Sequence, residues 1–340
     1  MSIIYQENND NIDFNEVHQI LVDAFDGRGF LSVDKIENAF TNSSKVVYAF
    51  DDKKLIGCAR AISDGEWSVI YNVAISPKYQ GKGVGKELIY SLINQLKGQH
   101  IFTYTHPQTV SFYERLGFNR SKQAFKYALF NDEEELNRME QIGFYLPRGY
   151  KFEEEFYREE KKKLIDKKTN VNIRYSSNYN DVNIKDIVNV LEKAFGRERD
   201  LNTVKKEFDN SHNYSFAFDG NKLIGCARLV GDKTEYAILL NVAVLPEYQG
   251  LGVATKIINN LAAQVPTYNI FIHAHPGSAN YYNSKKEFRR YKTAFIYNDG
   301  SLLKDEMGKK FAIPSGFRYP DEFDKEYMKY YKGKIYGKIK

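Results

Sequence analysis

The chain has 340 residues, of which 42% are hydrophobic and 27% charged, so long-range disorder, collagen and coiled coil are excluded as its main structure. The formal net charge of +5 is small for this length and does not require a nucleic-acid partner. Two cysteines, Cys58 and Cys226, are too few for a disulfide framework. The start shows no signal peptide, and no apolar run approaches the roughly 18 residues of a membrane helix. We therefore expect a cytoplasmic protein without a membrane partner.

An internal repeat spans nearly the whole of each half. Residues 49–60 (AFDDKKLIGCAR) recur 168 positions later as residues 217–228 (AFDGNKLIGCAR), and shorter matches follow in the same order. A repeat of this length indicates a duplicated domain rather than a solenoid unit. We expect two domains, residues 1–165 and 166–340, which are joined by the charged stretch 158–170.

Hydrophobic periodicity predicts a mixed order of helices and strands in the first half, and the second half repeats it from Val171 onward. The expected elements are strands at 3–5, 45–50, 55–62, 67–75 and 101–104, helices at 14–25, 33–40, 83–96 and 108–116, and a final hairpin over 118–130. The Asp51-Asp52 turn is expected to join two of these strands as a hairpin. This order predicts an α/β fold with a mixed sheet, in which a meander is followed by a strand–helix–strand crossover.

A glycine-rich loop follows the strand at 67–75 and opens the next helix; its members are Gln80, Gly81, Lys82, Gly83, Val84, Gly85 and Lys86. Glycines let the backbone approach a ligand, and the free amides at a helix start bind anions such as a pyrophosphate. The second copy keeps the small residues but loses both lysines; it consists of Gln249, Gly250, Leu251, Gly252, Val253, Ala254 and Thr255. The alternative interpretation is a glycine-rich turn that binds no ligand.

Both loops resemble the coenzyme-A loop Gln/Arg-x-x-Gly-x-Gly/Ala of the GCN5-related N-acetyltransferase (GNAT) superfamily. The preceding sequences NVAISPKY (72–79) and NVAVLPEY (241–248) are similar to that family's fourth strand and turn. The sequence SFYERLGF (111–118) resembles its Phe-Tyr-Glu-x-x-Gly-Phe helix end. Because the resemblance covers both halves, it implies a protein with two tandem GNAT domains.

The resemblance implies that acetyl-CoA binds along the fourth strand, with its pyrophosphate on the loop amides. The strand residues that would pair with the pantetheine arm are Val73, Ala74 and Ile75, and Val242, Ala243 and Val244 in the second half. Tyr113 stands where the family often has the general acid that protonates the leaving thiolate, a role that a phenol can fill at neutral pH. The alternative is a tyrosine that only packs in its helix.

The sequence departs from the family pattern at the general base. Many members carry a Glu just before the Asn72 position, where this chain has Tyr71 and, in the second half, Leu240. The candidates for the base are Glu66, His106 or a chain of water molecules. His106 stands where the family often has Asn. It would serve as a base or contact the pantetheine, or alternatively it would only orient the loop after the fifth strand.

The second half departs further, because one inserted residue leaves either Tyr282 or Asn283 at the position of Tyr113. We therefore expect the first half to carry the chemistry. The second half would bind acyl-CoA, shape the acceptor site or stabilise the pair. The repeated segments 144–150 and 311–317 are interpreted as caps or interdomain packing, with an acidic wall for a cationic acceptor as the alternative. We interpret the lysine- and tyrosine-rich C-terminal tail as solvated rather than as a contact with nucleic acid or anionic lipid.

These observations predict an acetyl-CoA-dependent N-acetyltransferase that modifies the primary amine of a small molecule, for which an antibiotic is one candidate. The alternatives are a non-catalytic, regulatory acyl-CoA-binding protein and a protein N-acetyltransferase. We expect no metal and no nucleic-acid partner, and the sequence predicts no oligomeric state.

Overall fold

The computed structural model describes residues 3–25, 27, 31–127, 133–147, 150–152, 171–297, 306–313 and 319. The expected connector 158–170 and the lysine-rich tail 329–340 lie outside the described residues. Parts of the repeated segments 144–150 and 311–317 lie outside them as well.

The first half contains the strands β1 (Ile3–Gln6), β2 (Lys45–Asp51), β3 (Lys54–Ser63), β4 (Trp67–Ile75), β5 (His100–Tyr104), β6 (Phe118–Arg120) and β7 (Ala124–Tyr127). Its helices are α1 (Phe14–Ala24), α2 (Val33–Thr41), α3 (Val84–Gln95), α4 (Val110–Arg115) and α5 (Glu133–Gln141), with short 3-10 turns η1 (Pro77–Tyr79) and η2 (Pro107–Thr109). The element order predicted from the sequence is confirmed up to β6.

The second half repeats this order. Its strands are β8 (Ile173–Ser176), β9 (Asn213–Asp219), β10 (Lys222–Gly231), β11 (Tyr236–Val244), β12 (Asn269–His273), β13 (Phe288–Arg290) and β14 (Ala294–Tyr297). Its helices are α7 (Ile184–Phe195), α8 (Leu201–Asp209), α9 (Val253–Gln264), α10 (Ala279–Asn283) and α11 (Glu306–Phe311), with 3-10 turns η3 (Tyr179–Asp181), η4 (Pro246–Tyr248) and η5 (Pro276–Ser278).

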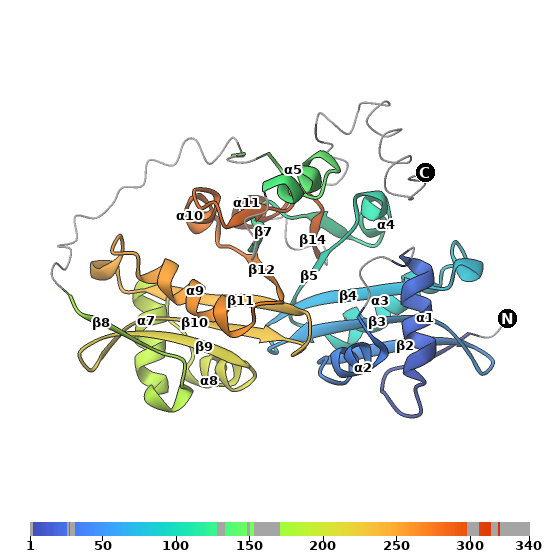
Figure 1. Cartoon of the computed structure of the whole chain (residues 1–340), viewed down its shortest axis with the longest axis horizontal. Helices are drawn as coiled ribbons and strands as arrows, with labels where there is room; N and C mark the ends of the chain where they lie inside the picture. Colours follow the sequence, from blue (N-terminus) through green and yellow to red (C-terminus); the bar gives the residue numbers. More distant parts are fainter. Residues whose placement is uncertain are drawn as a thin grey trace.

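The strands form two seven-stranded sheets, and each sheet takes one strand from the opposite half. The first sheet has the order β1-β2-β3-β4-β5-β14-β6, and the second has the order β13-β7-β12-β11-β10-β9-β8. Strand β14 lies between β5 and β6 and pairs antiparallel with both. Strand β7 likewise lies between β12 and β13. The exchanged strands, with α4, α5, α10 and α11, form what we call the exchange lobe at the top of Figure 1.

The expected hairpin over 118–130 is wrong. Strands β6 and β7 follow each other in the chain but belong to different sheets, because β14 occupies the place beside β6 that a hairpin partner would take. The sequences of β7 (AFKY) and β14 (AFIY) are nearly the same, so each has the alternation needed to complete either sheet.

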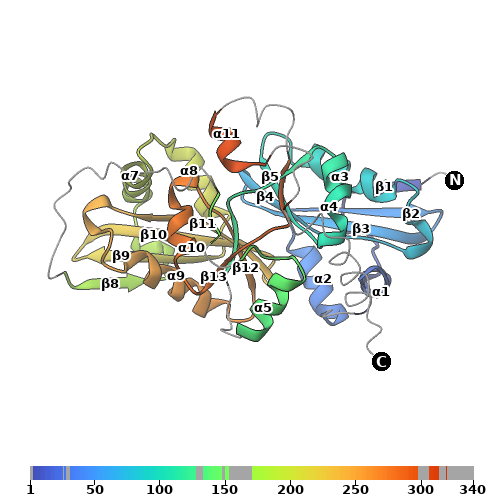
Figure 2. The same ribbon diagram turned by 90° about the horizontal axis from the view of Figure 1, so that it is seen from above.

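The rest of each sheet follows the expected meander and crossover. Strands β2 and β3 form an antiparallel hairpin whose turn residue Asp52 has a positive φ of 55°. Strand β4 runs parallel to β5 after the crossover through α3, and β11 runs parallel to β12 after α9. Viewed from above, the two halves lie side by side with the exchanged segments crossing between them (Figure 2).

Helices cover both faces of each sheet. Helix α1 begins at the cap residue Asp13, whose carboxylate accepts a hydrogen bond from the Asn15 amide at 2.8 Å. Its apolar stripe of Val17, Ile20 and Leu21 is buried against β3 and β4, while α3 covers the opposite face.

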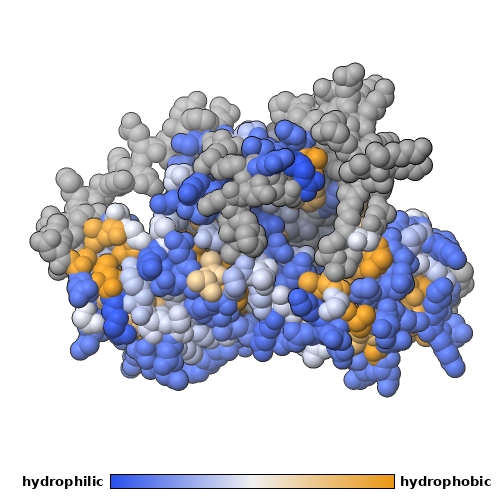
Figure 3. Space-filling view, in the orientation of Figure 1, coloured by the Kyte–Doolittle hydropathy of each residue, from blue (hydrophilic) through white to orange (hydrophobic). Residues whose placement is uncertain are grey.

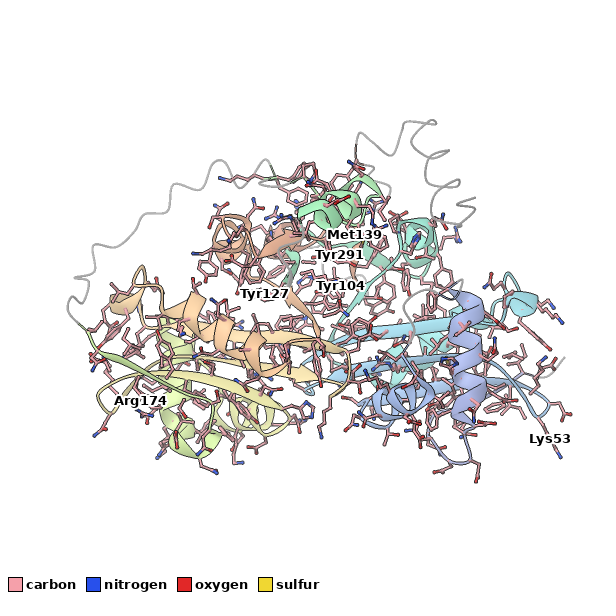
Figure 4. The ribbon with its side chains drawn as sticks, in the orientation of Figure 1. Lys53, Tyr104, Tyr127, Met139, Arg174 and Tyr291 are labelled. Carbon is pink, nitrogen blue, oxygen red and sulfur yellow. The ribbon has the colours of Figure 1, made fainter. Side chains whose placement is uncertain are left out.

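A separate apolar cluster fills the space between the two halves, and we call it the interdomain cluster. It includes Ile62, Val69, Tyr71, Phe102, Val230, Ile238, Leu240, Phe271 and Tyr291, with Tyr104 and Met139 packed against it. Figure 4 shows Met139 of α5 with Tyr291 and Tyr104 below it. The two halves therefore share an apolar core of their own between the core clusters of the individual halves.

Among the residues that the structure describes, no helix has the length and apolar character needed to cross a membrane. The same residues contain no group of three or more His, Cys, Asp or Glu side chains arranged to hold a metal ion. Cys58 and Cys226 are separate buried thiols at equivalent positions, and burial raises the pKa of each to about 12.

Candidate functional site

Each sheet opens into a wedge where its two central parallel strands part. Strands β4 and β5 are paired from Trp67 to Ile70, and the Thr103 hydroxyl donates to the Ile70 carbonyl at 3.1 Å at the last pair. Beyond Ile70 the edge of β4 no longer faces β5, so its backbone groups are available to another partner. Strands β11 and β12 part in the same way after Leu239. Figure 3 shows a hollow on this face, beneath the exchange lobe on the side of the first half.

An asparagine in the left-handed conformation bends each fourth strand at the start of its free edge. Asn72 has a φ of 50° and Asn241 a φ of 53°, and the pairing register with the neighbouring strand shifts at each of them. The Nε of Arg60 donates to Asn72 Oδ1 at 2.6 Å, and the Nε of Arg228 donates to Asn241 Oδ1 at 2.7 Å. Sequence reasoning missed both arginines, although each stands inside the repeated segment.

The free edge of β4 carries the residues predicted to pair with pantetheine. Val73 and Ile75 are half-buried and Ala74 is buried, and Val242, Ala243 and Val244 follow the same course along β11. The Gln80 side chain ties the glycine-rich loop to this edge, because its Nε2 donates to the Ile75 carbonyl at 3.1 Å. In the second half Gln249 makes the equivalent bond to Val244 at 3.0 Å.

The glycine-rich loop ends as the N-terminus of a helix of 12 residues in both halves. Gly81 and Gly83 have φ values of 76° and 88°, and Gly83 is the cap residue of α3. Gly250 and Gly252 repeat this conformation before α9. The first helical amides lack partners within the helix, and the helix dipole favours an anion there. No atom lies within 4 Å of a Cβ built on Gly81 or Gly83, so the loop surface is open to a ligand.

The two loops differ in charge. Lys82 and Lys86 are exposed beside the first loop, where their ammonium groups lie over the rings of Tyr79 and Tyr90 at 4.9 and 5.5 Å. The equivalent residues of the second loop are Leu251 and Thr255, which carry no charge. The remaining residues of each loop form the start of the following helix. These are Val84 and Gly85 in α3, and Val253 and Ala254 in α9. Both loops therefore fit a pyrophosphate, and the first also supplies two cations to it.

Tyr113 lies in α4 above the vertex of the first wedge. Its side chain is buried, and its ring stacks on Phe295 of β14 with centroids 5.8 Å apart. Burial raises the pKa of Tyr113. The Thr103 and Thr105 side chains lie beside its phenol at the end of β5, but their hydroxyl protons are used elsewhere. Thr103 donates to the Ile70 carbonyl, and Thr105 donates to the Thr109 hydroxyl, which itself donates to the His106 carbonyl.

Tyr282 is the structural equivalent of Tyr113, which decides between the two candidates left by the sequence. Its ring packs on Phe125 of β7 at 5.6 Å and edge-on to Phe288, as Tyr113 packs on Phe295 and Phe118. Asn283 instead donates its side-chain amide to the Tyr150 carbonyl. The second half has Ile272 and Ala274 in place of Thr103 and Thr105, so Tyr282 lacks the equivalent hydroxyls.

His106 is placed at the turn between β5 and α4. Its Nδ1 accepts a hydrogen bond from the Gln108 amide at 3.2 Å, and its ring packs edge-on against Phe144 at 5.2 Å. His275 makes the same cap to Gly277 at 3.0 Å. These contacts support the interpretation that the repeated histidine orients the loop after the fifth strand; a catalytic role for His106 stays a prediction.

Glu66, the other candidate side chain for the base, and Tyr71, which stands at the family's glutamate position, lie in different surroundings. Glu66 precedes β4 at its interdomain end, about 20 Å along the strand from Val73, since a strand rises about 3.3 Å per residue. Tyr71 is buried, stacks on Tyr236 of the second half at 4.6 Å, and burial holds its pKa well above its usual value. Neither side chain is therefore suited to accept a proton from an amine at the wedge.

Comparison with known proteins shows which family both halves resemble. The model of the acetyltransferase (GNAT) family matches residues 14–118 and 184–284, more than half of the chain. An "uncharacterized N-acetyltransferase ycf52" of Pyropia yezoensis is 37% identical over 133 residues, covering 36% of this chain and 74% of the relative. A "histone acetyltransferase TAP1" of Glycine max is 40% identical over 80 residues, covering 22% of this chain and 35% of the relative. The solved tandem GNAT protein from the clavulanic acid biosynthesis pathway shares 12% identity with a TM-score of 0.47, covering 87% of this chain and 98% of that one.

Proposed function

Because the chain belongs to the acetyltransferase (GNAT) family, we propose that it is an acetyl-CoA-dependent N-acetyltransferase whose first half acetylates the primary amine of a small molecule. The family uses acetyl-CoA, and this chain carries two family wedges in tandem. The observation that carries the assignment of the chemistry to the first half is the contact of Tyr113 with Thr103 and Thr105, which Tyr282 does not have.

The free edge and the loop of each half support acyl-CoA binding. In this proposal the backbone of Val73–Ile75 pairs with the pantetheine amides, and the amides that open α3 hold the pyrophosphate. Lys82 and Lys86 strengthen this site by charge. Binding of the remote pyrophosphate fixes the position of the thioester at the vertex of the wedge, which lowers the entropic part of the barrier.

The chemistry needs one proton donor from the chain. The neutral amine attacks the thioester carbonyl carbon, so that a C–N bond forms as the C–S bond breaks, and the nitrogen loses its proton to water. Tyr113 delivers its phenolic proton to the departing thiolate and is then reprotonated by solvent. Thr103 and Thr105 offer Tyr113 only oxygen lone pairs, because their own protons go to Ile70 and Thr109, so the role assigned to them is to orient the phenolic proton.

The acceptor in this proposal is small. The face of β4 that carries Val69 and Tyr71 is covered by the second half, where Tyr71 stacks on Tyr236. A long peptide would need an open groove along this face, so the covered face supports a small amine. An antibiotic remains one candidate among such amines, and nothing in the residues of the wedge selects it.

Two alternatives differ from this proposal in what they predict for turnover. The absence of a family glutamate at Tyr71 favours a non-catalytic protein that binds acyl-CoA as a signal. The Glycine max relative, named as a histone acetyltransferase, favours a protein acceptor. Turnover of any small amine contradicts the first alternative, and faster turnover of basic peptides than of small amines favours the second.

The experiment that tests the proposal begins with calorimetric titration of acetyl-CoA into the full chain. We expect saturable binding, with a stoichiometry near two if both loops bind and near one if only the lysine-bearing loop does. The double variant Lys82→Leu with Lys86→Thr introduces the second half's residues and should weaken only the first site. A panel of small amines and peptides is then assayed with the wild type and with Tyr113→Phe. Absence of binding at millimolar acetyl-CoA, or turnover unchanged by Tyr113→Phe, would contradict the proposal.

A further inference from the structure

The strand exchange places an aromatic ring of each half behind the tyrosine of the other half. Phe295, in β14 of the second half, is fully buried and stacks on Tyr113 of the first at an interplanar angle of 27°. Phe125, in β7 of the first half, is equally buried and packs on Tyr282 of the second at an angle of 36°. The two contacts are equivalent in the fold but differ in surroundings, because Thr103 and Thr105 lie beside Tyr113 where the second half has Ile272 and Ala274.

The same segment of the second half also holds the hydroxyls beside Tyr113. Phe295 lies directly opposite Thr103 in the ladder between β14 and β5. The Thr105 amide donates to the Thr293 carbonyl at 3.1 Å, and the Thr293 hydroxyl donates back to the Thr105 carbonyl at 2.6 Å. Phe295 of the second half therefore touches the tyrosine, and the segment around it fixes the strand that carries Thr103 and Thr105.

We propose that Phe295 is a positioning residue for Tyr113, so that the second half is a working part of the first half's active site. This inference rests on the proposed function of Tyr113 as the general acid. The ring of Phe295 stacks on one face of the Tyr113 ring, Phe118 packs edge-on against it at 5.5 Å, and Tyr113 is only 5% exposed, so packing holds the phenol in place. A shortened side chain at 295 leaves space into which the phenol ring can tilt.

The test compares two substitutions in the full chain. Phe295→Leu and Phe125→Leu remove the same ring from equivalent buried positions, so we expect similar decreases of the melting temperature. For Phe295→Leu we expect kcat to fall about tenfold to hundredfold, as misplacement of a reacting group does, with the KM for acetyl-CoA within about twofold of the wild type. Phe125→Leu should leave kcat unchanged. Phe295→Met, which keeps an unbranched apolar side chain against the ring, should recover most of the lost kcat.

A double variant separates positioning from general damage. In the Tyr113→Phe background, Phe295→Leu should produce no further decrease of kcat. If Tyr113→Phe is as active as the wild type, the proposed function is wrong and the inference with it. If Tyr113→Phe is impaired but Phe295→Leu and Phe125→Leu behave alike, the inference alone is overturned.

Discussion

Arg60 of the first half donates from Nη2 to Asp232 Oδ2 of the second half at 2.7 Å, and both side chains are buried. The equivalent pair, Arg228 with Asp64, joins the halves in the opposite direction at 2.5 Å. Each arginine also holds the asparagine that bends the fourth strand of its own half. The interface between the halves and the free edges of the two wedges therefore depend on the same two side chains.

These two ion pairs should not be equally important for stability. Arg228 has a second carboxylate nearby, because Glu207 Oε2 lies 3.5 Å from its Nη2, whereas the residue equivalent to Glu207 in the first half is Ala39. Removing Asp232 leaves Arg60 as a buried unpaired charge, which costs about 3–5 kcal/mol. We expect Asp232→Ala to lower the free energy of unfolding by this amount.

Asp64→Ala is the matched control, because Arg228 keeps Glu207 as a partner. We expect it to be less destabilising than Asp232→Ala by about 1–2 kcal/mol, since a buried ion pair with Glu207 remains. Urea unfolding of both variants at neutral pH measures the difference. Equal losses would show that Glu207 does not compensate for the missing aspartate.

The space beside the glycine-rich loop differs between the two halves, and the first half's version is the contact between Gly85 and Ile75. A Cβ built on Gly85 would lie 2.9 Å from Ile75 Cδ1, which is closer than real side chains approach. The second half has an alanine at the equivalent position, Ala254, but it pairs this with the shorter Val244. We expect Gly85→Ala to displace the Ile75 side chain on the free edge and raise the KM for acetyl-CoA several-fold.

The double variant Gly85→Ala with Ile75→Val should restore this KM, because valine lacks the Cδ1 methyl group. It should also be up to about 1 kcal/mol more stable than the wild type, since alanine favours a helix over glycine. Steady-state kinetics and thermal unfolding measure the two effects. A KM that stays high in the double variant would mean that the added methyl group itself blocks the ligand.

Thr105 provides a third prediction, because the second half has Ala274 at its position. The Thr105 side chain lies beside the Tyr113 phenol and is bonded to the Thr109 hydroxyl, so its removal should let the phenol shift and lower kcat by about tenfold. We expect this for Thr105→Ala, with the KM for acetyl-CoA unchanged. Ala274→Thr is the control and should not change turnover. A Thr105→Ala enzyme with wild-type kcat would remove the hydroxyl from the proposed mechanism.

The sequence predicts the repeated parts of the fold well, because their signals are local. The helix at α3 and the glycine-rich loop before it follow from periodicity and from glycines that the turn requires, and Gly83 does adopt a left-handed conformation. The tyrosine of the helix end was also predicted, because Tyr113 stands within a contiguous motif. Each of these features is determined by residues that lie close together in the sequence.

The strand exchange could not be predicted from the sequence in this way. Phe118–Tyr127 has the alternation of a hairpin, and nothing within it distinguishes a partner in the same half from one about 170 residues away. The contact of Phe295 with Tyr113 and the pair Arg60–Asp232 exist only once the two halves have assembled. The sequence signal for this ion pair is an arginine and an aspartate that recur at equivalent positions of the two halves. Once the structure shows that they are buried, a partner is expected, because such groups are seldom buried alone.

His273 gives the fold a dependence on acidic pH. Its ring stacks on Phe102 at 3.8 Å, both ring nitrogens are buried without a hydrogen-bond partner among the described residues, and burial lowers its pKa to about 3, with His100 acting in the same direction. The unfolded chain binds this proton near pH 6.5 and the folded chain does not, so stability is lost as the pH falls from about 6.5 toward 3. At pH 5 the loss from this group is about 2 kcal/mol.

We expect His273→Phe, which keeps the stack on Phe102, to lose less stability than the wild type between pH 7 and pH 5 in urea unfolding. His100 and His212, whose pKa values are also lowered by burial, are present in both proteins, so the difference isolates His273. Identical pH dependence in the two proteins would mean that His273 gains a proton in the folded state as readily as in the unfolded chain.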